Sequence, residues 1–420
     1  MKLSLKIAPV ARFGQREHFR PPDLDSRPPT AIEFTSRMMT CLWLICTCLA
    51  IIGSVYAGFA AILLGRFFTK WPAGAPTPPP SVTILKPLCG AEPELEANLA
   101  SFCSQIYPGQ VQIVLGIQDP TDPAAVIVRR LMSSFPHVAI DLEINAQSHG
   151  ANRKISNVLN SIPHSRGEIV VLSDSDIQAA PDYLRQITAA LQGPGVGLVT
   201  CLYRGLPIGG IWSQLASAQI DHRFLPSVIV GLSLGLAKPC FGSTIAVHAE
   251  TLRRIGGFAA FADQLADDYA MGAAVRRLGL EVAIPPMVVD HVCSERSFAD
   301  LARHELRWAR TIRLVDPLGY MCSVVTHPLP FALIAVALQG FEPASLTILA
   351  LVLACSLLVP LQFARSLGRG RVPIWLTPVR DMLSFATFLA SFLPWPVTWR
   401  GRRYKVRPDG TLTPAPGNEA

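Results

Sequence analysis

The chain has 420 residues, of which 50% are apolar and 16% charged, and its mean hydropathy is +0.35. These values exclude an ordinary soluble protein and fit a membrane protein with one soluble domain. The net charge of +7 is explained by basic flanks beside membrane segments, although anionic headgroups or a phosphorylated substrate would fit it too; we expect no nucleic-acid partner. The ten cysteines have no C-x-x-C spacing, which argues against a zinc site or a disulfide framework.

The first predicted element is a membrane-spanning helix. Residues 38–65 contain no charged residue, and at 1.5 Å per residue they can cross a hydrocarbon core of about 30 Å. A cleaved signal peptide is the alternative, but the run follows a long leader, 1–37, and exceeds the length of a signal core. The Pro-rich segment 66–81 then predicts a linker, because consecutive prolines cannot continue a helix.

Residues 82–320 predict one α/β domain. The segments between its β-rich runs have helical or loop patterns, and this alternation is typical of a largely parallel sheet. The predicted strands are SVTILKPL, VQIVLGIQD, VAIDLEIN, EIVVLSDSD and GLVTCLY.

Two carboxylates, Asp174 and Asp176, follow the apolar strand that begins at Glu168. Ligands of an open parallel sheet bind beyond the carboxyl ends of its strands, and side chains at i and i+2 share a face of an extended chain. Mg²⁺ or Mn²⁺ takes one or two protein carboxylates and completes its shell with substrate phosphates and water. The D-x-D pair therefore predicts a divalent-metal site, with helix capping ahead of Pro181 as the alternative.

Three further features follow the order expected of one site. Asp119 ends another apolar strand, and Lys154, next to Arg153, lies at a predicted helix start where it can meet a diphosphate. Asp267 and Asp268 lie in the first turn of an amphipathic helix. Each has a structural alternative, namely a turn aspartate, an exposed basic helix start and an N-cap pair. Their joint occurrence favours a common site.

The segment HELRWARTIR (304–313) places Arg307 beside Trp308. Adjacent helical residues point about 100° apart, so the guanidinium can meet a phosphate while the indole meets a sugar or a lipid. An amphipathic helix that leads into the membrane is the alternative.

The C-terminal part predicts further membrane segments within 321–398. Two apolar runs, 322–340 and 344–364, are followed by a third, 374–398, which contains Arg380 and Asp381. For this third run a span, a re-entrant hairpin and an interfacial helix all fit, and the basic tail 399–420 favours the hairpin or the interfacial helix.

A shorter apolar segment lies inside the predicted α/β domain. The stretch 224–237 is too short to span a membrane; it fits a buried core helix and, less well, a segment that dips into the bilayer interface. His222, just before it, is a site residue or a polar flank.

Together the segments IQDPTDPA, NRKISN, SDSDI, ADDY, RW and WRGRRYKVRPDGT resemble the membrane glycosyltransferases of the GT-A fold, and among them the ceramide glucosyltransferase family, glycosyltransferase family 21. The resemblance implies that Asp119 contacts the nucleotide of a UDP-sugar, that Asp174 and Asp176 form the metal and diphosphate site, and that Asp268 is the catalytic base. Arg307 and Trp308 match the end of the Q/R-x-x-R-W motif, whose first position here is His304. Lys154 or Arg307 would neutralise the leaving diphosphate.

The full SDSD and HELRWARTIR look most like the bacterial hopanoid biosynthesis-associated branch. This resemblance implies inverting transfer of N-acetylglucosamine from UDP-N-acetylglucosamine to a hopanoid such as bacteriohopanetetrol, at the cytosolic face of a bacterial inner membrane. The alternatives are ceramide glucosylation with UDP-glucose, a processive polysaccharide synthase, and an inactive membrane scaffold or lipid-binding protein.

Overall fold

The computed structural model describes residues 31–69, 78–368, 373–393, 397–399, 402–407 and 410–414. Most of the predicted leader 1–37, half of the Pro-rich linker 66–81, and parts of the basic tail lie outside the described residues.

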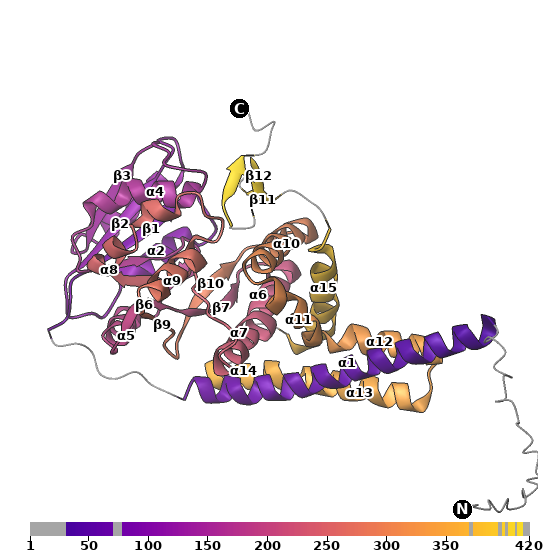
Figure 1. Cartoon of the computed structure of the whole chain (residues 1–420). Helices are drawn as coiled ribbons and strands as arrows, with labels where there is room; N and C mark the ends of the chain where they lie inside the picture. The colour runs from indigo at the N-terminus through magenta and orange to yellow at the C-terminus, as the bar shows by residue number, and fades with distance from the viewer. Residues whose placement is uncertain are drawn as a thin grey trace, which may run out of the picture.

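The centre of the molecule is a seven-stranded sheet of order β3-β2-β1-β4-β8-β6-β9 (Figure 1). The β1–β2, β2–β3, β1–β4 and β6–β9 pairs are parallel, whereas β8 runs antiparallel to both β4 and β6, so the predicted largely parallel sheet is confirmed. The strands are β1 Val82–Leu88, β2 Val111–Ile117, β3 Ala139–Ile144, β4 Ile169–Leu172, β6 Val196–Thr200, β8 Ile245–His248 and β9 Glu281–Ala283.

The strands form because their Val-, Ile- and Leu-rich runs are buried on both faces, as in sheets that helices cover on each side. The two faces give two separate apolar clusters, one around Ile84, Ile113 and Val171 and the other around Leu85 and Val170. The helices of this domain are α2 Leu95–Cys103, α3 Ala124–Ser134, α4 Arg153–Ser161, α5 Tyr183–Leu191, α8 Ala249–Arg254 and α9 Asp267–Arg277.

The single strand predicted from GLVTCLY is wrong, because the chain changes sheets within it. β6 ends at Thr200, whose hydroxyl accepts a hydrogen bond from the amide of Phe241 (2.9 Å). After the buried Cys201, β7 (Leu202–Pro207) pairs with β10 (Val288–Cys293) in a second sheet that includes β5 (Ile177–Gln178). In this second sheet β10 pairs with β5, which directly follows the D-x-D loop, so β10 lies beside that loop.

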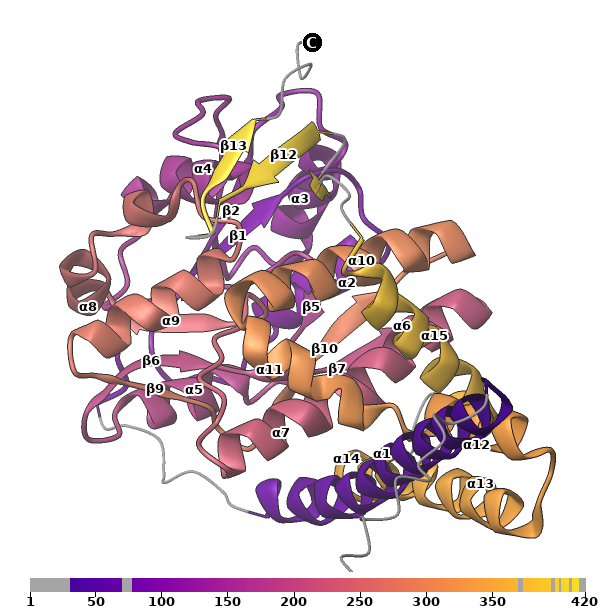
Figure 2. The same cartoon turned by 45° about the vertical axis from the view of Figure 1, so that its right-hand side comes forward.

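Among the described residues, two helical segments are long and apolar enough to cross a membrane. They are Phe34–Phe67 within α1 (Ala31–Phe67) and Pro343–Leu367, which joins α13 (Pro343–Ser356) to α14 (Leu358–Leu367). A third candidate is bent by 57°, between Pro317–Thr326, which begins with α11 (Pro317–Cys322), and α12 (Pro328–Gln339). Figures 1 and 2 show α1 alongside α12, α13 and α14, and these helices are in contact with it.

The third apolar run, for which the sequence favoured a hairpin or an interfacial helix, contains one continuous helix, α15 (Thr377–Ala390), and no hairpin lies within those residues. Its charges are buried against the protein: Arg380 is 1% exposed and Asp381 5%. They pair with Glu305 of α10 (Phe298–Val315) and with Arg223, which follows α6 (Ile211–Gln219). Because these pairs satisfy both charges, α15 is docked on the α/β domain.

The segment 224–237 is a buried helix in its first part only, where Leu225 and Ile229 cluster with Leu202 of β7. Its helix α7 (Leu225–Ser233) packs against α1, and Leu234 and Leu236 beyond it are 51% and 77% exposed. A small antiparallel sheet of β11 (Val397–Trp399), β12 (Arg402–Val406) and β13 (Leu412–Pro414) follows near the C-terminus.

Candidate functional site

A cavity of about 990 Å³ lies beyond the carboxyl ends of β2 and β4. The residues that the sequence predicted for the site come from five separate segments of the chain, and the cavity brings all of them together. They are Asp119, Lys154, Asp174, Asp176, Asp268, Arg307 and Trp308.

Lys154 links two of the acidic segments. Its ammonium lies 2.8 Å from Asp174 Oδ1 and 3.3 Å from Asp267 Oδ2, and Asn152, which caps α4, donates to Asp267 Oδ1 (3.1 Å). Burial disfavours the charged lysine, but the carboxylates outweigh burial and raise its pKa. Burial raises the pKa of Asp174 despite Lys154. The helix starts of α4 and α9 are thereby tied to the D-x-D loop.

Asp176 meets a residue that the sequence did not predict. Its Oδ2 lies 3.3 Å from His291 Nε2, from β10, while its buried Oδ1 has no hydrogen-bond partner. Burial alone would raise the pKa of Asp176, but the charge and hydrogen bond of His291 lower it. Burial alone would lower the pKa of His291, but the charge and hydrogen bond of Asp176 raise it. The alternation of β10 (VVDHVC) marks His291 as inward-facing, but only the second sheet reveals its partner.

Lys86 is a second residue that sequence reasoning missed. It is 1% exposed inside β1, and its ammonium donates to the backbone oxygens of Asp174 (2.8 Å) and Ile177 (3.5 Å) beneath the D-x-D loop. The same ammonium lies 3.6 Å from the centre of the Phe102 ring. Burial lowers its pKa to about 7, against the opposing charge of nearby carboxylates. A lysine in the apolar run VTILKPL was the available signal.

The D-x-D loop suits a hard divalent cation in part. Both Asp174 and Asp176 line the cavity, and the buried Oδ1 of Asp176 has no hydrogen-bond partner, so it can accept a metal bond. Within the described ranges no three His, Cys, Asp or Glu residues form a group that could hold a metal ion alone. Such an ion would therefore share its ligands between this loop and a bound diphosphate.

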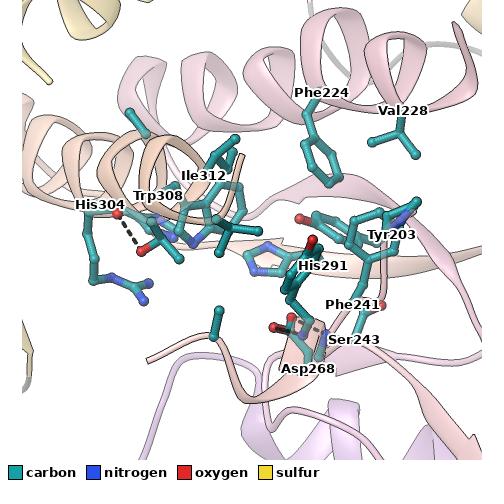
Figure 3. Close-up of a pocket in the computed structure, with 18 of the residues that line it drawn as sticks. Tyr203, Phe224, Val228, Phe241, Ser243, Asp268, His291, His304, Trp308 and Ile312 are labelled. Carbon is teal, nitrogen blue, oxygen red and sulfur yellow. Dashed lines mark hydrogen bonds between the residues drawn. The ribbon is translucent and has the colours of Figure 1, made fainter. Parts of the chain in front are cut away.

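Asp268 faces the cavity from the first turn of α9 (Figure 3). Its two oxygens accept backbone hydrogen bonds from Gly242 (2.9 Å) and Tyr269 (2.7 Å). Burial, then the charge of Asp267, raises its pKa to about 6. A Cβ at position 242 would lie 2.8 Å from Asp174 Oδ2, so a larger residue there would displace that carboxylate. Asp268 is thus a fixed carboxylate whose pKa lies near neutrality, as a general base requires.

Trp308 forms one wall of the cavity. His304, four residues earlier on α10, meets its ring edge-to-face at 4.6 Å, and Glu295 holds the His304 ring through Nδ1 (2.6 Å). Position 304 therefore supports the indole, a role that the sequence left undefined. Figure 3 shows His304 and Trp308 facing a group of further rings; those within 7 Å of Trp308 are His291, Tyr203 and Phe224.

The remaining predicted residues lie at the cavity's edge or outside it. Asp119 is exposed, and the backbone amide and hydroxyl of Thr121, which donate to its Oδ1 (2.8 and 2.7 Å), lower its pKa. Arg307 lines the cavity from α10. His222 does not line it: its ring packs edge-on against Phe363 of α14, and burial lowers its pKa to about 4.

Comparisons with known proteins agree with this architecture. The chain is 29% identical over 176 residues to a ceramide glucosyltransferase of Candida albicans, covering 36% of this chain and 32% of that protein. It is 25% identical to ceramide glucosyltransferase 1 of Caenorhabditis elegans, covering 49% and 44% of the two chains. The matches thus span less than half the length of these curated relatives.

Among solved structures, a mannosyltransferase from Pyrobaculum calidifontis in complex with GDP-Man and Mn²⁺ is 23% identical, with a TM-score of 0.48, and the match covers 82% of this chain and 97% of that one. The model of the family described as "Glycosyl transferase family 21" matches residues 45–412, which include the sheet, the whole cavity and most of α1. The chain therefore belongs to glycosyl transferase family 21.

Proposed function

We propose that this protein transfers a sugar from a UDP-sugar to a membrane lipid, with inversion at the anomeric carbon. One observation carries the proposal: a single cavity contains the D-x-D loop and Asp268, and it continues to Tyr56 of α1, a helix able to span a membrane. A water-soluble donor and a lipid acceptor differ in solubility, and such a cavity gives both of them access to one carboxylate.

The donor half of the site follows from its charges. Asp119 would contact the nucleotide, while the cations Lys154 and Arg307 would neutralise charge that develops on the leaving diphosphate. Asp174 and Asp176 would hold Mg²⁺ or Mn²⁺, which supplies further neutralisation of that charge. Trp308 would pack against the sugar.

Asp268 is the proposed base because the neighbouring acids are engaged. Lys154 pairs with Asp174 and Asp267, and His291 pairs with Asp176. Asp268 would take the proton of an acceptor hydroxyl as the oxygen bonds to the anomeric carbon. The bond from that carbon to the diphosphate breaks, and its electron pair leaves with UDP. With one base and no nucleophilic carboxylate, direct displacement inverts the configuration.

For the acceptor, we propose a hopanoid such as bacteriohopanetetrol, with UDP-N-acetylglucosamine as the donor. The residues of the segment HELRWARTIR and the second acid of SDSD support this pairing of donor and acceptor. The names of the curated relatives favour a second candidate, ceramide with UDP-glucose. The buried acids of the site favour an enzyme over an inactive scaffold, because burying charged groups costs stability even when they are paired, and a scaffold would gain nothing from them. The proposed location is the inner membrane of a bacterium, in multi-pass form with the catalytic domain in the cytosol.

The test is a competition assay on membranes that contain the protein. UDP-glucose and UDP-N-acetylglucosamine, in equal amounts and distinguishable by isotope, are offered with ceramide, with bacteriohopanetetrol and with no added lipid, and products are identified by mass spectrometry. We expect a glycosylated hopanoid that carries N-acetylglucosamine and is absent from Asp268→Asn membranes. Dominant glucosylceramide would establish the second candidate instead. No lipid product with any pair would refute transfer to these lipids.

A further inference from the structure

The cavity extends well past Asp268, and its walls change in character along the way. Beyond the carboxylates it is bounded by Val228 and Gly231 of α7 on one side and by Ile312 and Val315 of α10 on another. Figure 3 shows Val228 and Ile312 on two different helices, both on the same side of Asp268. This part of the cavity, here called the passage, is therefore mainly apolar, and Arg223, the cation that precedes α7, is already paired with Asp381.

The passage ends at membrane helices. Tyr56 of α1 lines its far end, and its hydroxyl donates a hydrogen bond to Ser227 Oγ of α7 (3.0 Å). On the other side, Val325 of the bent third candidate span also lines the cavity. The far end thus lies between segments with the length and composition of membrane spans.

Exposed apolar side chains flank this end on both sides. Leu236, at the tip that follows α7, is 77% exposed, and on α11 Leu318 and Met321 are 73% and 58% exposed. The tip is fixed, because the amides of Leu236 and Ala237 both donate to Gly231 O (2.8 and 3.1 Å). Apolar side chains held outward on both rims are suited to contact with lipid tails.

We infer that the acceptor lipid enters sideways from the bilayer, between α7 and the α10–α11 corner, and that Val228 and Ile312 form the walls between which its apolar part lies. Its hydroxyl-bearing end then points at Asp268, while the donor occupies the opposite end near Asp119 and the D-x-D loop. This inference rests on the proposed function and adds the route and the residues that select the acceptor's shape.

The first experiment narrows the passage. Ile312→Trp adds bulk at a side chain that is 42% exposed, so the fold tolerates it, and Val228→Phe narrows the passage from the facing helix. Met321→Trp is the matched control, because Met321 is exposed at the rim but does not line the cavity. We expect each narrowing variant to raise KM for bacteriohopanetetrol or ceramide at least tenfold, with UDP affinity by calorimetry within twofold of wild type. Unchanged lipid KM values in both variants would overturn the route.

The second experiment does not depend on turnover. A photo-crosslinking p-benzoylphenylalanine replaces Ile312, or Leu318 as the control, and the protein is illuminated in vesicles that contain phospholipid and one test lipid. We expect a test-lipid adduct at position 312 that excess unlabelled test lipid suppresses, and phospholipid adducts without such competition at position 318. An adduct at position 312, together with no sugar transfer by the unsubstituted protein to any test lipid, would refute the proposed function while supporting the passage. Absence of a competed adduct at position 312, with transfer intact, would refute the passage alone.

Discussion

At the scale of single residues, the hydrogen bonds of Asp268 fix what its substitution should do. Asparagine keeps the shape of the side chain, but its one oxygen can accept from only one of the amides of Gly242 and Tyr269, and it cannot take a proton. We expect Asp268→Asn to lower kcat by about 10²–10⁴-fold, the usual contribution of a positioned base, with UDP affinity nearly unchanged. Glu281→Gln, at an exposed acid on β9, is the control and should leave turnover intact. Turnover by the Asp268 variant close to that of wild type would remove this residue from the base role.

The raised pKa of Asp268 makes a second prediction. Burial and the charge of Asp267 place it at about 6, and a base acts only when it is ionised. Since a carboxyl is protonated below its pKa, kcat/KM should fall about tenfold per pH unit below about 6 and reach a plateau above it. The measurement is kcat/KM for the UDP-sugar from pH 4.5 to 8, with protein stability checked at each pH. A level profile down to pH 5 would contradict a base with this pKa.

The sequence predicts only those site residues whose chemistry is visible from their immediate neighbours in the chain. Asp174, Asp176 and Asp268 can be identified as candidates because each is an acid beside an apolar run. Lys86 and His291 do not, because their roles depend on strand pairing. The β1–β4 register sets Leu85 opposite Leu172 and so brings Lys86 to the loop after β4, and the β10–β5 pairing sets His291 opposite Ile177, next to Asp176. No local pattern encodes those neighbours.

At the scale of elements, the position of α10 depends on α15. Arg380 forms two short contacts with Glu305 (2.5 and 2.8 Å), and its Nη1 also donates to Leu215 O of α6 (3.2 Å). Thr387 of α15 donates to the same carboxylate (3.2 Å). Because α10 also carries Arg307 and Trp308, the C-terminal helix supports one wall of the cavity.

Removing one partner of the Arg380–Glu305 ion pair, here called the clamp, should therefore lower the stability of the protein. Removing one partner of a buried ion pair typically costs about 3–5 kcal/mol, so Arg380→Ala should strongly lower the unfolding temperature and raise KM for the lipid. Arg380→Met combined with Glu305→Leu leaves no unpaired charge and should recover much of the stability. Arg303→Ala on α10 is the control. The Arg303 side chain is 77% exposed, and its ion pair with Asp300 contributes less than about 1 kcal/mol to stability. Equal unfolding temperatures for Arg380→Ala and Arg303→Ala would show that the clamp does not hold α10.

The elements themselves were predictable where burial alone decides them. The apolar runs predict β1 to β4, and the length of the segment without charged residues predicts α1. The single strand predicted at GLVTCLY is wrong, and the alternatives for 374–398 could not be narrowed to one from the sequence, because the environment of each segment changes part-way along it. β6 and β7 lie in different sheets although their residues read as one strand, and α15 hides two charges whose partners are more than 70 residues away in sequence.

At the scale of the whole molecule, the proposed function gives the cavity an end for a water-soluble donor and an end for a lipid. Asp119 is exposed at one end, and Tyr56 of a candidate span lies at the other. A donor that arrives through water should follow its bulk concentration, whereas an acceptor that arrives by lateral diffusion should follow its concentration in the plane of the bilayer.

This difference gives a prediction for the intact protein in lipid vesicles. If the acceptor is diluted tenfold with inert phospholipid at a constant bulk amount, the rate below saturation should fall about tenfold, because lateral encounters scale with mole fraction. If the whole suspension is instead diluted with buffer at constant UDP-sugar concentration, the rate per protein should stay constant. The measurement is the initial rate of glycolipid formation over both dilution series. A rate that followed the bulk amount of acceptor alone would mean that the lipid reaches Asp268 through water, and the passage between α7 and α10 would then have no role in its delivery.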